Sequence, residues 1–253
     1  MSVLKSLVDS VRGGAIEVVD LTAPLSSDTP ILQLPEPFSN TIRFSLEEIS
    51  RYDDRGPAWY WNDIHTGEHS GTHFDAPVHW ITGRDGEDVS QVPPRNLIAP
   101  AVVLDFADEA AKDHDFLLRI DHVKEWERAN GPLPDGGWLL YRTGWDTRSG
   151  DQDDFLNGSH TPGISVECAE WLAAETPIAG LGVETVGTDA GAAHSFTPPF
   201  PCHSFLLGAG KYGLTQLRNL DRLPVTGAVV LAPPLPIVGG SGSPVRVLAL
   251  VER

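Results

Sequence analysis

Short apolar runs recur along the chain, separated by glycine, proline and charged residues, and most are rich in Val, Ile and Leu. Runs of this kind, bounded by turn-forming residues, are typical of β-strands. The segments AVVLDF and WLLY lack polar alternation and are expected to be buried. The predicted strands are residues 15–21, 41–46, 101–106, 138–141, 178–184, 227–231 and 245–251.

Three segments carry helical periodicity together with helix start and stop signals. Asp121 begins the second of them and Gly131–Pro132 stops it, while Ser165 is a good N-cap for the third, with Glu167 in its first turn. The predicted helices are residues 3–11, 121–130 and 165–174. Because strands outnumber helices without alternating strictly, we expect an α/β fold with a mixed β-sheet and packed helices.

The length of 253 residues suits one large domain or two small ones. No linker, charge block, low-complexity run or internal repeat divides the chain. We therefore expect a single domain over residues 1–253. A Gly/Pro-rich loop at 187–203 is of the kind that carries function on a rigid scaffold, and a second loop, GGSGSP, lies near the C-terminus.

Acidic residues outnumber basic ones by 35 to 18, for a formal net charge of −17. This charge argues against nucleic acid or an anionic membrane as the partner and favours a small molecule. The segment MSVLKSLVDSVRGG has no unbroken apolar run, which predicts a cytoplasmic protein. The only cysteines, Cys168 and Cys202, are too few for a disulfide framework and are expected to be reduced.

The segment HSGTHFDAPVH, residues 69–79, is the densest group of metal-capable side chains. Glycine and proline disfavour a helix here, and in an extended segment His73 and Asp75 project from the same face. A bend at Ser70–Gly71 could swing His69 towards them, and Pro77 could turn the chain towards His79. A single histidine is more often structural, but four such residues in this segment favour a metal site.

Aromatic residues flank this segment and could form the wall of a pocket for a planar substrate. Trp59 and Trp61 lie upstream, Trp80 follows His79, and Phe200 lies in the distant loop. Packing in the core is the usual alternative for such residues.

His203, which ends the loop at 187–203, is the best distant candidate to join the cluster. A hydrogen-bonded loop histidine is an equally good interpretation. Cys202 as a nucleophile has less support, because adjacent residues of an extended segment point to opposite faces. No role is predicted for His65 or His194.

The segment HSGTHFDAPVH resembles the HxGTHxDxPxH motif of the cyclase-like metal-dependent hydrolases, which include kynurenine formamidases and isatin hydrolases, and matches every fixed position. Further similar stretches are GRDG, RTGWD, TPGIS, GVETVGTDAG, PPFPCH, LTQLRNLDRLP and GSPVRV, so the resemblance covers most of the chain.

The resemblance implies an amidohydrolase of swivelling β/β/α architecture that forms a homodimer or a larger assembly such as a homotetramer. At the matching positions, His69, His73 and Asp75 would be metal ligands and His79 the catalytic acid/base. His203 matches a later family histidine near the metal, and we assign it a second catalytic role.

One departure concerns the segment TQLRNL, which stands where the kynurenine formamidase pattern has EGLxNL and its metal-binding glutamate. Without that carboxylate, one divalent ion, Mn²⁺ or Zn²⁺, is expected rather than two. The isatin hydrolase-like branch, to which this chain is closer, implies a glutamine ligand. Gln216 is the candidate, although Thr215 is the alternative for this place.

The expected reaction is hydrolysis of a C–N bond in a small cyclic amide or aryl formamide, by metal-activated water with a histidine acid/base. A lactone hydrolase, or a lyase or cyclase that does not incorporate solvent oxygen, would need a similar site. A catalytically silent metal-binding module is a third alternative, and it would leave no coordination position open for water.

Overall fold

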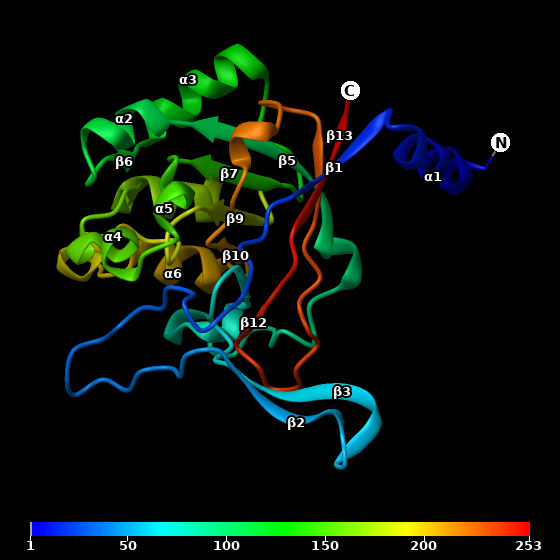
Figure 1. The fold of residues 1–253 in the computed structure, drawn as a ribbon. Coiled ribbons are helices and arrows are strands. Elements are labelled where there is room, and N and C mark those ends of the chain that lie inside the picture. Colours follow the sequence, from blue (N-terminus) through cyan, green and yellow to red (C-terminus); the bar gives the residue numbers. More distant parts are fainter. Residues whose placement is uncertain (1) are drawn as a thin grey trace.

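The computed structural model describes residues 2–253, and a nine-stranded mixed sheet forms its centre (Figure 1). The strand order is β1-β13-β11-β5-β7-β9-β10-β4-β12. Strands β5, β7, β9 and β10 pair in parallel, and the remaining neighbours are antiparallel. The strands of this sheet are β1 (Ile16–Asp20), β4 (His73–Asp75), β5 (Ile98–Asp105), β7 (Trp138–Arg142), β9 (Gly180–Val183), β10 (Tyr212–Thr215), β11 (Ala228–Leu231), β12 (Gly242–Pro244) and β13 (Leu248–Glu252).

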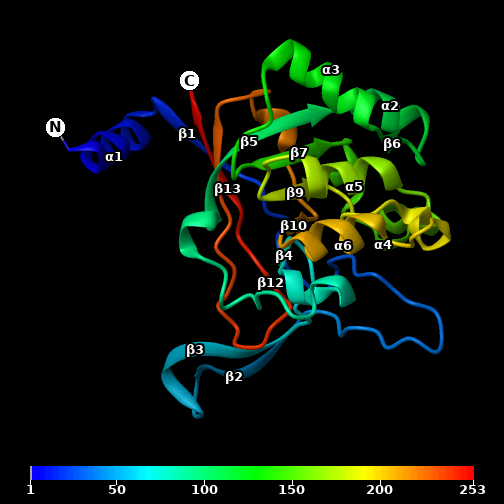
Figure 2. The ribbon, with the colours of Figure 1, turned by 180° about the vertical axis from the view of Figure 1, so that it is seen from behind.

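Two small two-stranded sheets complete the β-structure, β2 (Ser45–Asp53) with β3 (Gly56–His65), and β6 (Leu117–Leu118) with β8 (Gly163–Ile164). The β2–β3 hairpin extends away from the large sheet in both views (Figures 1 and 2). The helices are α1 (Val3–Gly13), α2 (Ala107–Lys112), α3 (Ile120–Asn130), α4 (Gln152–Leu156), α5 (Val166–Glu175) and α6 (Pro201–Leu206). Among residues 2–253, no helix is both long and apolar enough to cross a membrane.

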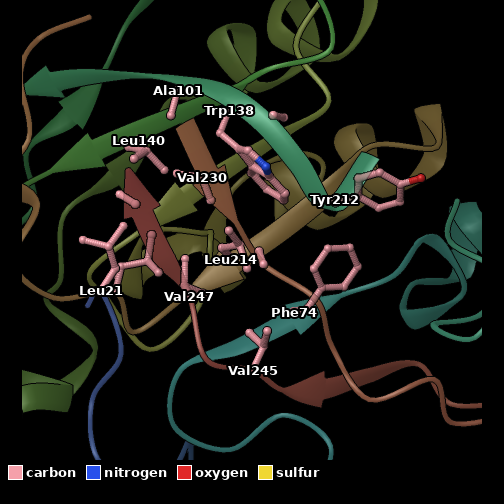
Figure 3. Packing of buried hydrophobic residues seen from close by; sticks show 14 of the residues in the cluster. Leu21, Phe74, Ala101, Trp138, Leu140, Tyr212, Leu214, Val230, Val245 and Val247 are labelled. Carbon is pink, nitrogen blue, oxygen red and sulfur yellow. The ribbon is translucent and has the colours of Figure 1, made fainter. Parts of the chain in front are cut away.

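The centre of the large sheet is buried on both faces, as strand β7 shows. Trp138 and Leu140 point into a core that strands from both ends of the sheet enclose (Figure 3). Leu139 and Tyr141 point the other way, into a second core covered by α3, α5 and α6. A strand that is buried on both faces needs apolar residues at consecutive positions, and the WLLY segment of β7 supplies them. The prediction of an α/β mixed sheet with packed helices is confirmed.

Most predicted elements are present with bounds shifted by a few residues. Ser165 caps α5 as predicted, with its hydroxyl accepting from the Cys168 amide at 3.3 Å. The predicted start of the second helix at Asp121 is wrong, because α3 begins one residue earlier and Arg119 occupies its N-cap. The predicted strand at 41–46 is largely wrong, since β2 starts only at Ser45.

Two predicted loops contain regular structure. The last residues of the loop at 187–203 belong to α6, so His203 lies in a helix. Pro201 suits the first position of this helix, because a backbone N–H there would have no partner within the helix. The GGSGSP loop contributes β12, an edge strand of the large sheet. Strand β12 lies beside β4, and α6 brings the His203 ring to 5.5 Å from the His79 ring, measured between centroids.

Candidate metal centre

Strand β4 places the central residues of the cluster. His73 and Asp75 project from the same face of this extended strand, and His73 Nε2 lies 3.4 Å from Asp75 Oδ1. Gly71 adopts a φ of +62°, which glycine tolerates without strain, and the resulting bend brings His69 back over the strand. His69 Nδ1 then lies 2.8 Å from the same Asp75 oxygen. The predicted bend and shared face are both present.

A single 3-10 turn at Pro77–His79 brings the fourth residue to the cluster. The His79 ring stacks on the His69 ring with centroids 3.8 Å apart. Ligand atoms of His69, Asp75 and His79 all lie within 4.8 Å of one another. By this measure His79 is as close to the centre as a ligand would be, so proximity alone does not separate ligands from a proton carrier.

The His73 ring is fixed by two neighbours. Its Nδ1 atom donates to the Gly71 carbonyl at 2.7 Å, which leaves Nε2 as the nitrogen with a free lone pair. The Thr215 hydroxyl, opposite His73 on β10, lies 3.1 Å from this Nε2. Among the two candidates for the distant ligand, Thr215 therefore contacts the cluster directly.

Gln216 follows β10 in a left-handed conformation, with a φ of 52°. Its side-chain Nε2 donates to the Pro30 carbonyl at 3.2 Å, and its backbone nitrogen donates to Thr185 at 2.9 Å. Thr72 holds the Gln216 carbonyl with its hydroxyl at 2.7 Å. This buried residue is thus firmly placed, and its amide oxygen takes part in none of these three bonds.

The surroundings of Asp75 and His79 set the charge of each side chain. Burial opposes ionisation of Asp75, but the nearby His73 and His69 outweigh it and hold the pKa of this carboxyl well below its usual range. For His79, burial and the surrounding His69, His203 and His73 outweigh the attraction of Asp75 and lower its pKa to about 3. The site thus combines an ionised carboxylate with a neutral imidazole, and both are forms that bind a metal ion.

These side chains fit a divalent cation. Imidazole nitrogens and a carboxylate oxygen are the preferred protein ligands of zinc and manganese. They converge on one buried point, where Asp75 is only 2% exposed. An ionised carboxylate buried to this degree needs a cationic or hydrogen-bonding partner.

His203 joins the cluster from α6. Its ring lies 5.5 Å from the His79 ring and 4.8 Å from the Trp80 ring, measured between centroids. Phe200, at the N-cap of α6, packs edge-on against Trp80 at 5.6 Å. Trp80, Phe200 and His203 therefore lie together beside His79, and their contact with a substrate stays a prediction.

The other two predicted aromatic residues lie elsewhere. Trp59 and Trp61 belong to β3, in the projecting hairpin, and are 49% and 54% exposed. Within residues 2–253, the ring contacts of the cluster include neither of them. His65, on the same hairpin, pairs with Glu47, and His194 lies on an exposed 3-10 turn.

Sequence analysis missed several residues that support the cluster. Asp189 accepts from the backbone of Cys202 and from His203, while Ser241 contacts the His69 ring and itself donates to Glu68. Glu68 precedes the motif directly, which is the only local signal for it. Cys202 lies in a helix rather than in the extended segment assumed for it, and burial raises the pKa of its thiol well above the usual range. A thiol of this kind is a poor nucleophile.

The curled sheet and its histidine–aspartate cluster are those of a metal-dependent hydrolase. A family model described as "Putative cyclase" matches residues 19–190, and the chain belongs to this family.

Three similar proteins extend this result. The chain is 46% identical to isatin hydrolase from Roseibium aggregatum, covering 100% of this chain and 98% of that protein. It is 30% identical to kynurenine formamidase from Salinibacter ruber, over 70% of this chain and 74% of that enzyme. The solved structure of isatin hydrolase A from Ralstonia solanacearum superposes with a TM-score of 0.96 at 50% identity, covering 100% of this chain and 98% of the other.

Proposed function

We propose that this protein hydrolyses the C–N bond of a small cyclic amide of the isatin type, using a divalent metal ion. It is an enzyme acting on a non-peptide C–N bond. The observation that carries this proposal is the convergence of His69, Asp75 and His79 within 4.8 Å, in a chain 46% identical to an isatin hydrolase over its full length. An N-formyl arylamide is the second candidate substrate, supported by the 30% identity to a kynurenine formamidase.

His69, His73 and Asp75 would hold one Mn²⁺ or Zn²⁺ ion, together with either Thr215, the last residue of β10, or Gln216, which follows it. A divalent ion bound there supplies Lewis acidity towards water and the substrate carbonyl. TQLRNL has no carboxylate near Gln216, which supports one ion rather than two.

His79 is the proposed general base and acid. Its imidazole stacks on the ring of the proposed ligand His69, which places it where it can take a proton from the attacking water and return it to the departing nitrogen. The departing amine is a poor leaving group unless it is protonated. His203, 5.5 Å away, is the proposed second proton carrier.

Trp80 and Phe200 form the proposed wall for a flat ring, because they meet edge-to-face beside His203. Trp59 and Trp61 can serve the same purpose only if the hairpin of another copy reaches this site. We include that arrangement in the proposal.

A homodimer, or a homotetramer built from it, gives the hairpin a partner. The hairpin carries Leu46, Tyr60 and Ile64 at 52%, 39% and 66% exposure in addition to its tryptophans. A two-stranded sheet with exposed apolar side chains is marginal alone and is stabilised by packing. Sedimentation of the wild type and of Trp61→Glu tests this, and a monomeric wild type would contradict it. A cytoplasmic location stays a prediction from the sequence.

Metal analysis of the purified protein, followed by turnover assays, tests the reaction. Isatin, N-formylkynurenine and simple lactones separate the amide, formamide and lactone alternatives. A lyase or cyclase would form product without incorporating labelled oxygen from solvent, and a silent metal-binding module would turn over none of these substrates.

A further inference from the structure

We propose that Ser241 and Glu68 are positioning residues that hold His69 in the tautomer and orientation for metal binding. This inference rests on the proposed metal site. It assigns a role to the GGSGSP loop, which is 172 positions from His69 in the chain.

The three side chains form a chain of short hydrogen bonds. His69 Nε2 lies 2.8 Å from Ser241 Oγ, and Ser241 Oγ lies 2.6 Å from Glu68 Oε2. The backbone nitrogen of Ser241 donates to the same Glu68 oxygen at 3.1 Å. One carboxylate oxygen therefore holds both the backbone and the side chain of Ser241.

The direction of these bonds fixes the tautomer of His69. An ionised carboxylate only accepts, so the single hydroxyl hydrogen of Ser241 points to Glu68. The serine oxygen must then accept from His69, which places the ring hydrogen on Nε2. Nδ1 keeps its lone pair and faces Asp75 Oδ1 at 2.8 Å. A nitrogen lone pair and a carboxylate oxygen that face each other repel, and a cation bound between them would be attracted to both.

The backbone of β12 makes this contact possible. Gly242 pairs with Asp75, and the Ala76 nitrogen donates to the Ser241 carbonyl at 3.0 Å. A Cβ atom on Gly242 would lie 2.6 Å from His69 Cε1 and 2.4 Å from the Phe74 carbonyl oxygen. Only glycine allows the strand to lie this close to the His69 ring. The pairing of β12 with β4 thus places Ser241 behind the His69 ring.

The ends of the loop are also held. Val89 donates to the Gly240 carbonyl at 2.9 Å, and Gly239 donates to the Asp88 carboxylate at 2.9 Å. Ser241 is therefore held by hydrogen bonds on both sides. A carboxylate behind a ligating histidine raises the basicity of the ring and restricts its rotation, and loss of such a partner typically lowers metal affinity by about 10-fold to 100-fold.

The test is metal affinity, measured by competition of Zn²⁺ or Mn²⁺ alone between the protein and a chromophoric chelator. We expect Ser241→Ala and Glu68→Gln each to weaken binding by about 10-fold to 100-fold, and Ser241→Thr, which keeps the hydroxyl, to restore most of it. Ser243→Ala is the matched control. It removes a buried hydroxyl two residues further along, in β12, but that hydroxyl bonds Leu235 and Pro244 rather than the metal site.

Unchanged affinity in both Ser241→Ala and Glu68→Gln would overturn the proposal, as would an equal loss in Ser243→Ala. Thermal melts of the metal-free proteins check folding, and if Ser241→Ala does not fold, Glu68→Gln decides the test. A wild type that binds metal but hydrolyses no amide would contradict the proposed function and leave this inference standing. A wild type that binds no metal would overturn both.

Discussion

Asp189 lies beside the first turn of α6, and its Oδ2 atom is 2.5 Å from Nδ1 of His203. The same carboxylate accepts from the backbone nitrogens of Cys202 and His203 at 2.7 and 3.2 Å. Burial lowers the pKa of His203, but the hydrogen bond and charge of Asp189 outweigh it, so the pKa is raised overall. One carboxylate thus holds the start of the helix and the proton on the imidazole that faces the cluster.

Asp189→Asn keeps the shape of this contact and removes its charge. We expect kcat to fall by up to about 100-fold. Loss of the Asp189 charge should also lower the pKa of His203. The limb of the pH profile of kcat that reports His203 should therefore move to lower pH. Asp151→Asn is the control, since Asp151 caps the short helix α4 through an exposed side chain. A loss of activity without any shift of the pH profile would indicate that Asp189 acts only on the fold of α6.

His73→Ala and His79→Ala should separate ligand from proton carrier. We expect His73→Ala to lose its metal, because a ligand anchored by Gly71 and Asp75 is removed. His79→Ala should retain the metal while turnover falls by about 10²-fold to 10⁴-fold. Metal content and kcat of both variants are the measurements. Full activity in His79→Ala, or loss of its metal, would remove the role assigned to His79.

Trp80→Ala should weaken substrate binding. The Trp80 ring contacts both Phe200 and His203, so its removal opens the aromatic side of the site. We expect KM to rise by about 10-fold, the loss of a stacking contact worth about 1 kcal/mol or slightly more. Trp80→Phe should keep most of the affinity, although it loses the 3.2 Å bond from Nε1 to Ser204. A fall in kcat at constant KM would mean that Trp80 positions His203 rather than the substrate.

Burial of Glu184 predicts that the stability of the fold depends on pH. This carboxylate is 1% exposed and accepts from the Thr143 nitrogen, the Thr143 hydroxyl and the Trp145 nitrogen. Burial and the nearby Asp146 outweigh these donors and raise its pKa from an ordinary value of 4.5 to about 7.

The folded state binds the proton of the Glu184 carboxyl more tightly than the unfolded state does. The stabilisation that this proton gives the folded state is therefore complete below pH 4.5 and is lost as the pH rises through about 7. At about 1.4 kcal/mol per pH unit, the loss amounts to about 3 kcal/mol. Glu184→Gln should flatten this dependence in urea unfolding between pH 5 and 8, whereas Glu175→Gln, at the exposed end of α5, should not. Parallel pH curves for wild type and Glu184→Gln would contradict the assignment.

The sequence predicted the parts of the molecule that depend on local physics. The continuous apolar run of β7 is buried on both faces, and Ser165 caps α5. The motif at 69–79 also folds through local features, namely an extended strand with a glycine bend before it and a proline turn after it. Each of these follows from neighbours within a few residues.

The remaining errors come from contacts between distant segments. Trp59 and Trp61 are an exception, because β2 and β3 pair as a local hairpin that the apolar pattern did not predict, and this hairpin exposes both side chains. His203 lies in a helix whose first backbone nitrogens donate to Asp189, 13 positions before Cys202. The contact of Ser241 with His69 requires β12 to pair with β4. The pairing and register of two such segments cannot be predicted from the local pattern of either segment alone.

The most direct test of the central claim is isatin hydrolysis by protein that has been stripped of metal and then reloaded with Mn²⁺ or Zn²⁺. Ring opening should be lost with the metal, return on reloading, and remain absent in reloaded His73→Ala. Turnover that survives complete metal removal, or metal-loaded protein that opens neither isatin nor N-formylkynurenine, would contradict the account.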